Sequence, residues 1–200
     1  MSAIPAVVIL AAGSGSRFGG PLHKLLQPFT GTTVLAETLR QAVATHLHVV
    51  VVTTEPLAHV ARQHVAAKDV VVLPAVGSGA VEPVGMGYSI AAGVGASPNA
   101  KGWLMLPADM PMVRTATLTA AARALGGHPV VFAQHKGRRG HPVAFAAELY
   151  SELIMLTGDD GARRLLARYP AHGMECNDPG VLLDVDTEAD LLHMRRVQLA

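Results

Sequence analysis

Short runs of apolar residues, rich in Val and Ile and bounded by turn residues, recur along the chain at the length of β-strands. Because polar residues do not alternate within these runs, both faces of each predicted strand are expected to be buried, which is typical of a parallel sheet. The predicted strands cover residues 6–10, 48–53, 70–73, 103–106 and 130–133, and a final strand is predicted at 181–185.

Segments with helical periodicity fill the intervals between these strands. Apolar residues three and four positions apart, as on the buried face of a helix, occur within 34–43, 57–65 and 118–125. Two later helices are predicted, at 149–167 with a break at 158–161 and at 188–197. This alternation predicts an α/β fold: an open, doubly wound, mostly parallel sheet of Rossmann-like type between two helical layers, with its ligand crevice beyond the carboxyl ends of the strands.

Composition and charge restrict the kind of partner. Two hundred residues, half of them hydrophobic, can bury one substantial core, so a single domain over residues 1–200 is expected. Sixteen basic and fifteen acidic side chains leave a net charge of +1, which gives no overall attraction to nucleic acid or to an anionic membrane. The lone Cys176 suits a reducing compartment. We therefore expect a soluble, cytoplasmic protein with small-molecule ligands.

A glycine-rich segment follows the first predicted strand. It reads Leu10-Ala11-Ala12-Gly13-Ser14-Gly15-Ser16-Arg17-Phe18-Gly19-Gly20, and Lys24 comes shortly after it. Small residues let backbone N–H groups approach phosphate oxygens, and Arg17 and Lys24 add cationic donors. The segment has neither the Gly-Lys-Ser/Thr ending of a P-loop nor the dinucleotide-binding glycine pattern. The alternative interpretation is a plain glycine-rich turn with two solvated basic side chains.

The same segment resembles the signature of MobA-like nucleotidyltransferases, the family of the molybdenum-cofactor guanylyl- and cytidylyltransferases. The resemblance implies that residues 10–16 bind the nucleotide and that Arg17 and Lys24 stabilise charge during phosphoryl transfer. Lys24 follows Gly19 and Gly20 by a longer step than is common in the family, with Leu22 and His23 as added residues. His23 could contact the ligand, but the preferred interpretation is a solvated loop histidine.

Asp109 is the candidate metal ligand. It follows the strand at 103–106 within Pro107-Ala108-Asp109-Met110-Pro111, where open sheets bind ligands. A carboxylate there suits Mg²⁺, which prefers oxygen ligands and shares itself with substrate phosphates. The alternative is an N-cap for the next helix. The segment resembles the Asp-Met-Pro metal site of the family, which favours the metal and gives Asp109 a catalytic role.

A second carboxylate is expected near the C-terminus. The segment Leu183-Asp184-Val185-Asp186-Thr187 resembles the region from which the family recruits another metal ligand. Alternation along the predicted strand places Asp184 and Asp186 on one face. Asp186 is the preferred ligand and Asp184 the second choice. Asp186 or Thr187 could instead cap the last helix.

Three further segments resemble parts of the family that contact substrates. The Gly85-Met86-Gly87-Tyr88-Ser89 helix start implies nucleotide contacts from Gly87 and Ser89, although an ordinary helix start explains it as well. The segments at 136–143 and 156–163 resemble acceptor-side regions. They imply acceptor binding by Arg138, Arg139, His141, Asp159 and Arg163. Solvated arginines and a local ion pair are the simpler alternatives.

The resemblance implies a Mg²⁺-dependent transferase. Ala12 matches the Leu-Ala-Ala-Gly form of the cytidylyl-transferring members, so the expected reaction moves CMP from CTP to the terminal phosphate of molybdenum-bound molybdopterin and releases pyrophosphate. Guanylyl transfer from GTP, another cytidylyl or sugar-phosphate transfer, and a non-catalytic nucleotide-binding chaperone of the cofactor are the alternatives. A molybdoenzyme or its chaperone is a further possible partner.

Overall fold

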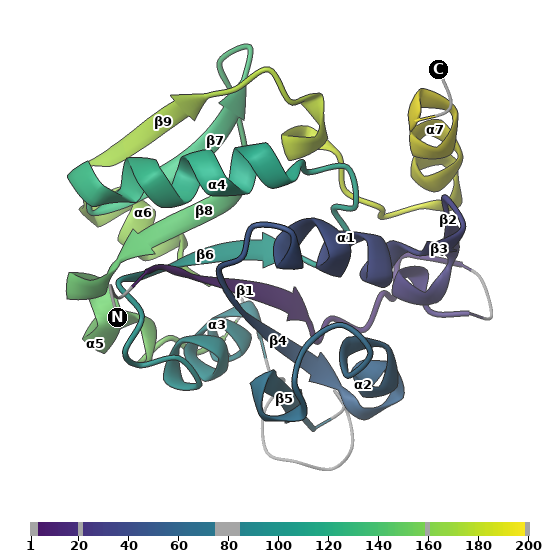
Figure 1. The fold of residues 1–200 in the computed structure, drawn as a ribbon, viewed down its shortest axis with the longest axis horizontal. Helices are drawn as coiled ribbons and strands as arrows, with labels where there is room; N and C mark the ends of the chain where they lie inside the picture. Colours follow the sequence, from purple (N-terminus) through teal and green to yellow (C-terminus); the bar gives the residue numbers. More distant parts are fainter. Residues whose placement is uncertain (1–3, 20–21, 75–84, 159–160, 199–200) are drawn as a thin grey trace.

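The computed structural model describes residues 4–19, 22–74, 85–158 and 161–198. Among these residues, seven strands form one sheet in the order β5-β4-β1-β6-β8-β7-β9, and two short strands pair separately (Figure 1). The strands of the main sheet are β1 (Ala6–Ala11), β4 (His48–Thr54), β5 (Val70–Leu73), β6 (Gly102–Pro107), β7 (Val130–His135), β8 (Arg138–Ala146) and β9 (Ala171–Glu175). The short pair is β2 (Pro28–Phe29) and β3 (Thr32–Thr33).

The sheet has a parallel half and a mixed half. β5, β4, β1 and β6 are mutually parallel. β8 runs antiparallel to both β6 and β7, and β9 is parallel to β7. The carboxyl ends of β1 and β6 therefore lie at the same edge of the sheet as the beginning of β8.

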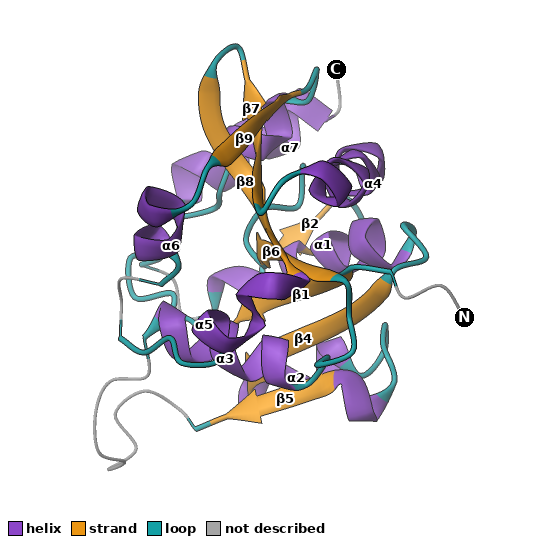
Figure 2. Cartoon of the chain, turned by 90° about the vertical axis from the view of Figure 1, so that its left-hand side faces the viewer, coloured by secondary structure: helices purple, strands orange, loops and turns teal. Residues whose placement is uncertain are grey.

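Helices cover both faces of the sheet, which gives three layers (Figure 2). The α-helices are α1 (Val34–Val43), α2 (Glu55–Ala61), α3 (Met86–Gly95), α4 (Thr115–Ala124), α5 (Tyr150–Leu153), α6 (Arg163–Arg168) and α7 (Glu188–Gln198). Short 3-10 helices are η1 (Lys24–Leu26), η2 (Ala67–Asp69), η3 (Leu125–Gly127), η4 (Ala147–Leu149) and η5 (Pro179–Leu182). One hydrophobic cluster joins the sheet to α1, α2, α4 and α7, and the other joins it to α3, α5 and α6.

The central strand β1 shows why the apolar runs are continuous. Its Val7 and Ile9 belong to the first cluster, whereas Ala6 and Val8 belong to the second. All four side chains are fully buried. Successive side chains of a strand point to opposite faces, so a strand covered by helices on both sides needs apolar residues at every position.

Helix α3 packs very close to the sheet. A Cβ added at Gly93 would lie 2.3 Å from Val8 Cγ1 of β1 and 3.0 Å from Val52 Cγ2 of β4. Only a residue without a side chain fits there, so Gly93 sets the distance between this helix and the two strands. The start of α3 is thereby fixed near the carboxyl ends of β1 and β4.

Five of the six strands predicted from the apolar pattern are confirmed, with ends that differ by two residues or fewer. The predicted sheet, mostly parallel and three-layered, is also confirmed. The strand predicted at 130–133, β7, is parallel to β9 as expected of a parallel sheet, but its other neighbour, β8, is antiparallel. The pattern missed β8 and β9, in which charged residues, Gly and Pro interrupt the apolar positions.

The turn between β7 and β8 makes this pair a hairpin. Lys136 and Gly137 have φ angles of 51° and 72°, as both central residues of a tight type I′ turn require. Their backbone N–H groups donate to the carboxylate of Glu175 on β9. The hairpin is therefore held to its neighbouring strand at the turn.

The strand predicted at 181–185 is wrong. Residues 179–182 form the 3-10 helix η5 instead, because Pro179 and the Asp178 side chain, which accepts a hydrogen bond from Gly180 N at 3.0 Å, start a helical turn. Val181 and Val185 are nevertheless fully buried. The apolar residues were thus correctly assigned to the core but not to a strand.

Two short helices, α5 and α6, lie in the helical segment predicted at 149–167. The described residues between them, 154–158 and 161–162, are not helical, so the break is wider than predicted. The last helix, α7, begins at Glu188 as predicted. Within the described parts of the chain, no helix has the length and apolar character needed to span a membrane.

Candidate functional site

A pocket of about 470 Å³ lies beyond the carboxyl ends of β1 and β6. These strands are parallel neighbours with Leu10 opposite Pro107, so the segments that follow them leave the sheet side by side. The pocket is lined by residues 10–17, by Lys24 and Leu25, by Gly85, Met86 and Ser89, and by Pro107 and Asp109. The glycine-rich segment and the acidic segment, far apart in sequence, therefore form one site.

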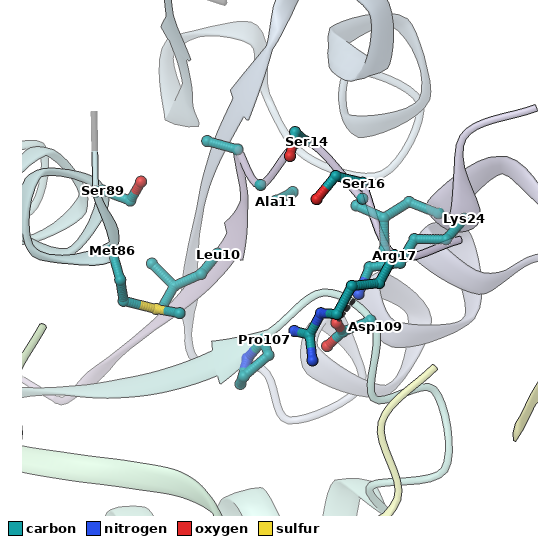
Figure 3. A pocket seen from close by; sticks show the side chains of 15 residues that line it. Leu10, Ala11, Ser14, Ser16, Arg17, Lys24, Met86, Ser89, Pro107 and Asp109 are labelled. Carbon is teal, nitrogen blue, oxygen red and sulfur yellow. Dashed lines mark hydrogen bonds and ion pairs between the residues drawn. The ribbon is translucent and has the colours of Figure 1, made fainter. Parts of the chain in front are cut away.

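Figure 3 shows how the labelled side chains divide between two sides of this pocket. Met86 and Ser89, from the beginning of α3, lie on one side, and Arg17 and Lys24 lie on the other, next to Asp109. One side is thus polar and charged, and the other is formed by a helix start.

The glycine-rich segment is anchored at its far end. Gly15 has a φ of 62°, a conformation that glycine adopts without strain, and its carbonyl oxygen accepts a hydrogen bond from Phe18 N at 2.9 Å. The Phe18 side chain is only 7% exposed and belongs to the core. This anchoring leaves the backbone of residues 13–16 at the pocket wall.

Charged side chains that are far apart in the sequence meet beside the glycine-rich segment. Lys24 Nζ lies 2.6 Å from Asp109 Oδ2 and 3.1 Å from Asp186 Oδ1, and Arg17 Nη1 lies 2.7 Å from Asp186 Oδ2. The side chains of Lys24, Asp109 and Asp186 are 12%, 17% and 23% exposed. Arg17 and Asp109 therefore belong to one charge cluster, joined through Asp186 and Lys24.

Electrostatics within the cluster favour the ionised form of Lys24. Burial opposes the charge on Lys24, but the field and hydrogen bond of Asp109, helped by Asp186, outweigh burial and raise the pKa of Lys24 above 10.5. Asp184 lies nearby. Burial, followed by the negative charges of Asp186 and Asp109, raises the pKa of Asp184 above its ordinary value.

The backbone around Asp109 is held by three elements. Ala108 N donates to Leu10 O of β1 at 3.1 Å, and Val185 N donates to Asp109 O at 2.9 Å. The Thr38 hydroxyl of α1 donates to Ala108 O at 2.9 Å. These bonds fix the direction in which the Asp109 carboxylate leaves the chain.

Asp109 does not cap the following helix, so that alternative is wrong. Helix α4 begins at Thr115, and the carboxylate at its start belongs to Asp178, which accepts from Arg114 N at 2.9 Å and from the Thr117 hydroxyl at 2.6 Å. The Asp109 side chain remains available to the pocket.

Asp186 also remains available to the charge cluster. At the start of α7, Thr187 N donates to Asp190 Oδ2 at 2.7 Å and Asp190 N donates to Thr187 Oγ1 at 3.2 Å, an exchange of the capping-box type. Thr187, rather than Asp186, therefore performs the capping role. The strand alternation proposed for Asp184 and Asp186 is wrong, since residues 183–187 contain no strand.

The carboxylates fit a divalent cation. Asp109 Oδ1 is buried and has no hydrogen-bond partner among the described residues, an arrangement that is costly unless another ligand satisfies the oxygen. Within the described parts of the chain, no group of three or more His, Cys, Asp or Glu residues forms a complete metal site. An ion held by two carboxylates and completed by water and substrate phosphates matches the preferences of Mg²⁺.

The helix start at Gly85 contributes to the pocket in a different way from the expectation. Ser89 lines the pocket, but Gly87 N donates to Gly158 O at 2.9 Å, and a Cβ at Gly87 would lie 2.7 Å from Thr157 O. Gly87 thus joins α3 to the segment before α6. Met86, 49% exposed, lines the pocket in its place.

The acceptor-side candidates that the structure describes do not line this pocket. Arg138 and Arg139 begin β8, where adjacent side chains point to opposite faces, and the Arg139 guanidinium stacks 4.0 Å above the Phe132 ring. The two guanidiniums therefore do not share one face. Arg163 is exposed at the start of α6, and Asp159 lies outside the described residues.

His141 lies nearer to the charge cluster. Because β8 runs antiparallel to β6, its first residues lie at the edge where Asp109 follows β6. Burial lowers the pKa of His141 below 6.5, and Asp109 partly opposes this effect while Arg139 adds to it. The negative charge of Asp109 therefore acts on the His141 imidazole.

The interpretation of His23 as a solvated residue is wrong. Its Nε2 lies 3.1 Å from Gly13 O, and its Nδ1 accepts a hydrogen bond from Leu25 N at 3.2 Å. His23 precedes η1, a position favourable for a side chain that accepts from the second backbone N–H of a helix. That position was visible in the sequence, but the short helix was not.

A family model described as MobA-like NTP transferase domain matches residues 7–173. The match includes the glycine-rich segment and the Asp109 segment, and it ends before Asp186.

Two curated relatives resemble the chain. The bifunctional protein GlmU of Dinoroseobacter shibae is 35% identical over 144 residues, which are 69% of this chain, and the chain spans only 31% of that longer protein. The purine catabolism protein PucB of Bacillus subtilis is 30% identical over 200 residues, covering 94% of this chain and 95% of PucB.

Among solved structures, the Mycobacterium tuberculosis H37Rv protein Rv0371c superposes with a TM-score of 0.78 at 28% identity, covering 96% of this chain and 98% of that one. A complex of Rv0371c with manganese superposes with a TM-score of 0.74 at 26% identity over the same shares of both chains.

Proposed function

The chain belongs to the MobA-like NTP transferase family, and on that premise we propose that it transfers CMP from CTP to the terminal phosphate of molybdenum-bound molybdopterin, releasing pyrophosphate. The observation that carries the transferase chemistry is the cluster of Arg17, Lys24, Asp109 and Asp186 beside a glycine-rich pocket wall. Basic side chains that can bind phosphates lie there beside carboxylates that can hold a metal ion, at the carboxyl ends of the parallel strands β1 and β6.

In the proposed reaction, an oxygen of the acceptor phosphate forms a bond to the α-phosphorus of the nucleoside triphosphate. The bond from that phosphorus to the oxygen bridging to the β-phosphate breaks, and pyrophosphate leaves with its electron pair. The acceptor phosphate is already anionic near neutral pH, so no strong general base is needed. Catalysis then depends on positioning and on stabilisation of phosphate charge.

The protein groups have separate parts in this proposal. Backbone N–H groups of residues 13–16 bind phosphate oxygens, while Arg17 and Lys24 stabilise the negative charge that develops on the leaving pyrophosphate. Asp109 and Asp186 would hold Mg²⁺, which when bound neutralises phosphate charge and favours departure of pyrophosphate. The manganese complex of Rv0371c supports a divalent ion in a related protein.

The nucleotide side of the proposal includes Leu10, Ala11, Ala12 and Ser89, which line the pocket. CTP is proposed as the donor because Ala12 stands where the cytidylyl-transferring members have Ala. The acceptor side is proposed to include His141, which lies toward Asp109, and a molybdoenzyme or its chaperone is proposed to receive the product.

A pyrophosphate-release assay tests the proposal. Purified protein is incubated with MgCl₂, each of CTP, GTP, ATP and UTP, and either molybdopterin with molybdate, a sugar phosphate or methylerythritol phosphate. Pyrophosphate is expected only with CTP and the pterin. Release with GTP and the pterin would change the base assignment, and release with a sugar phosphate would change the acceptor.

The Asp109→Asn variant separates a transferase from a carrier. A nucleotide-binding chaperone would bind CTP without pyrophosphate release, and the substitution would leave delivery of the pterin to a molybdoenzyme intact. A transferase loses pyrophosphate release in the variant. No release by the wild-type protein with any pair of substrates contradicts the proposed function.

A further inference from the structure

His23 connects two parts of the pocket wall that no motif links. Its imidazole lies behind the glycine-rich segment, is half-buried, and is absent from the residues that line the pocket, although the next residue, Lys24, lines it. Nε2 lies 3.1 Å from Gly13 O, and Nδ1 lies 3.2 Å from Leu25 N. One side chain thus spans from the phosphate-side segment to the helix that begins with Lys24.

The two contacts define the protonation state of the ring. Gly13 O can only accept, so Nε2 carries the hydrogen and donates; Leu25 N can only donate, so Nδ1 is bare and accepts. The two contacts therefore match the ring form with its hydrogen on Nε2 alone. Any other form would leave one of these two contacts without a hydrogen bond.

The bond to Gly13 O also orients the next amide. In a trans peptide the C=O of one residue and the N–H of the following residue point to opposite sides. A donor that holds Gly13 O on the His23 side therefore directs Ser14 N–H away from His23. Ser14 belongs to the pocket lining, whereas His23 does not.

We propose that His23 is a positioning residue, which holds the Gly13–Ser14 peptide so that Ser14 N–H faces the triphosphate and which fixes Lys24 relative to that peptide. The inference rests on the proposed function, because it assigns the orientation of the nucleotide-binding segment. His23 itself does not touch the nucleotide.

Gly15 supports this assignment. A Cβ at Gly15 would lie 3.2 Å from His23 Nε2 and 3.4 Å from Lys24 Cγ, and the φ of Gly15 is 62°. The segment therefore packs directly on the imidazole, with no room for a side chain between them. Movement of the ring would move both the segment and the start of η1.

Two substitutions separate the two hydrogen bonds of His23. His23→Gln places an amide N–H₂ near the position of Nε2 and can still donate to Gly13 O. His23→Asn places a carbonyl oxygen near the position of Nδ1, where it can accept from Leu25 N as an N-cap, but its amide is too short to reach Gly13 O.

Binding of CTP with MgCl₂ is measured by calorimetry for the wild type and both variants. His23→Asn is expected to weaken CTP binding about 10- to 100-fold, because Ser14 N–H would lose its hydrogen bond to a charged phosphate. The variant should also raise KM for CTP more than it lowers kcat. His23→Gln is expected to keep most of the affinity. ¹⁵N NMR of the free wild-type protein is expected to show His23 protonated on Nε2 alone.

If His23 serves only as a helix cap, His23→Asn binds CTP like the wild type and His23→Gln loses thermal stability. That result overturns the inference. A His23 signal protonated on Nδ1 also overturns it. If the wild type binds none of the four nucleoside triphosphates, the proposed function itself fails. If the wild type binds CTP and the Asn variant binds it equally well, only the role of His23 fails.

Discussion

The ammonium group of Lys24 lies 2.6 Å from Asp109 Oδ2, and it also reaches Asp186 Oδ1 at 3.1 Å. A basic residue of η1, just after the glycine-rich segment, thus lies between the two carboxylates proposed to hold a metal ion. Lys24 neutralises these carboxylates in the structure. In the proposed function, the oxygens of a triphosphate would offer the ammonium other partners.

Replacing Lys24 by Met is therefore expected to have opposite effects on two ligands. Mn²⁺ alone should bind about tenfold more tightly, because a competing positive charge beside both carboxylates is removed. CTP with metal should bind more weakly, since a phosphate partner is lost. Electron paramagnetic resonance of free Mn²⁺ measures the first effect and calorimetry the second.

The exposed Lys68 of η2 provides the control, and Lys68→Met is expected to leave both affinities unchanged. Equal Mn²⁺ affinity in the wild type and in Lys24→Met would contradict competition between the ammonium and the metal ion.

Asp109→Asn is expected to reduce the rate of pyrophosphate release by about 10²- to 10³-fold, comparable with the loss of one strong electrostatic contact in a transition state. The fold should persist, because the hydrogen bonds from Ala108 N to Leu10 O and from Val185 N to Asp109 O are made by the backbone and not by the Asp109 side chain. Steady-state kinetics and circular dichroism check the two expectations. Asp69→Asn is the control, since Asp69 pairs with His48 at the opposite edge of the sheet.

Gly93 and Gly95 form a matched pair in α3. Gly93→Ala is expected to lower the free energy of unfolding by about 1–3 kcal/mol, because its Cβ would meet Val8 Cγ1 at 2.3 Å. Gly95→Ala is expected to raise it by up to about 1 kcal/mol, because that position is exposed, has nothing within 4 Å, and alanine favours helix. Urea denaturation measures both, and equal effects would refute the close packing of α3.

Glu37 in α1 gives a pH-dependent contribution to stability. Burial opposes its ionisation, but hydrogen bonds from Arg40 and Gln41 outweigh burial and hold the pKa of Glu37 below 4.5. A lowered carboxyl pKa stabilises the fold at pH values above the unfolded pKa, and the stabilisation is lost as the pH falls through the folded pKa.

Glu37→Gln is therefore expected to cost about 1–2 kcal/mol at pH 7 and progressively less below pH 4.5. Urea denaturation of both proteins over a series of pH values measures the difference. A difference that does not change with pH would show that the charge of Glu37 has no part in it.

The sequence predicted the parallel half of the sheet well because burial on both faces requires uninterrupted apolar runs, as in β1 and β4. β8 could not be found in this way. It carries Arg138, Arg139, Gly140, His141 and Pro142 in its first half, where Arg138 and Arg139 pair with β7 rather than forming part of an apolar run.

The site was predictable to a different extent. The glycine-rich segment and Asp109 follow predicted strands, so their meeting at one edge follows from parallel pairing. Asp186 was chosen from the family resemblance, whereas its predicted local structure was wrong because Asp178 and Pro179 start a 3-10 turn. The role of His23 depends on a contact with Gly13 ten residues away, which no local pattern encodes.

The two-residue turn at Lys136 and Gly137 joins β7 directly to β8 at the pocket edge of the sheet. Elsewhere in the sheet, parallel neighbours require a crossover helix, so a change in loop length there disturbs the packing of a whole layer. Insertions at this hairpin leave the strand pairing in place and lose only the hydrogen bonds from the turn amides to Glu175. The chain can therefore acquire new side chains at this edge of the sheet by lengthening one exposed turn, while the glycine-rich wall of the pocket stays as it is.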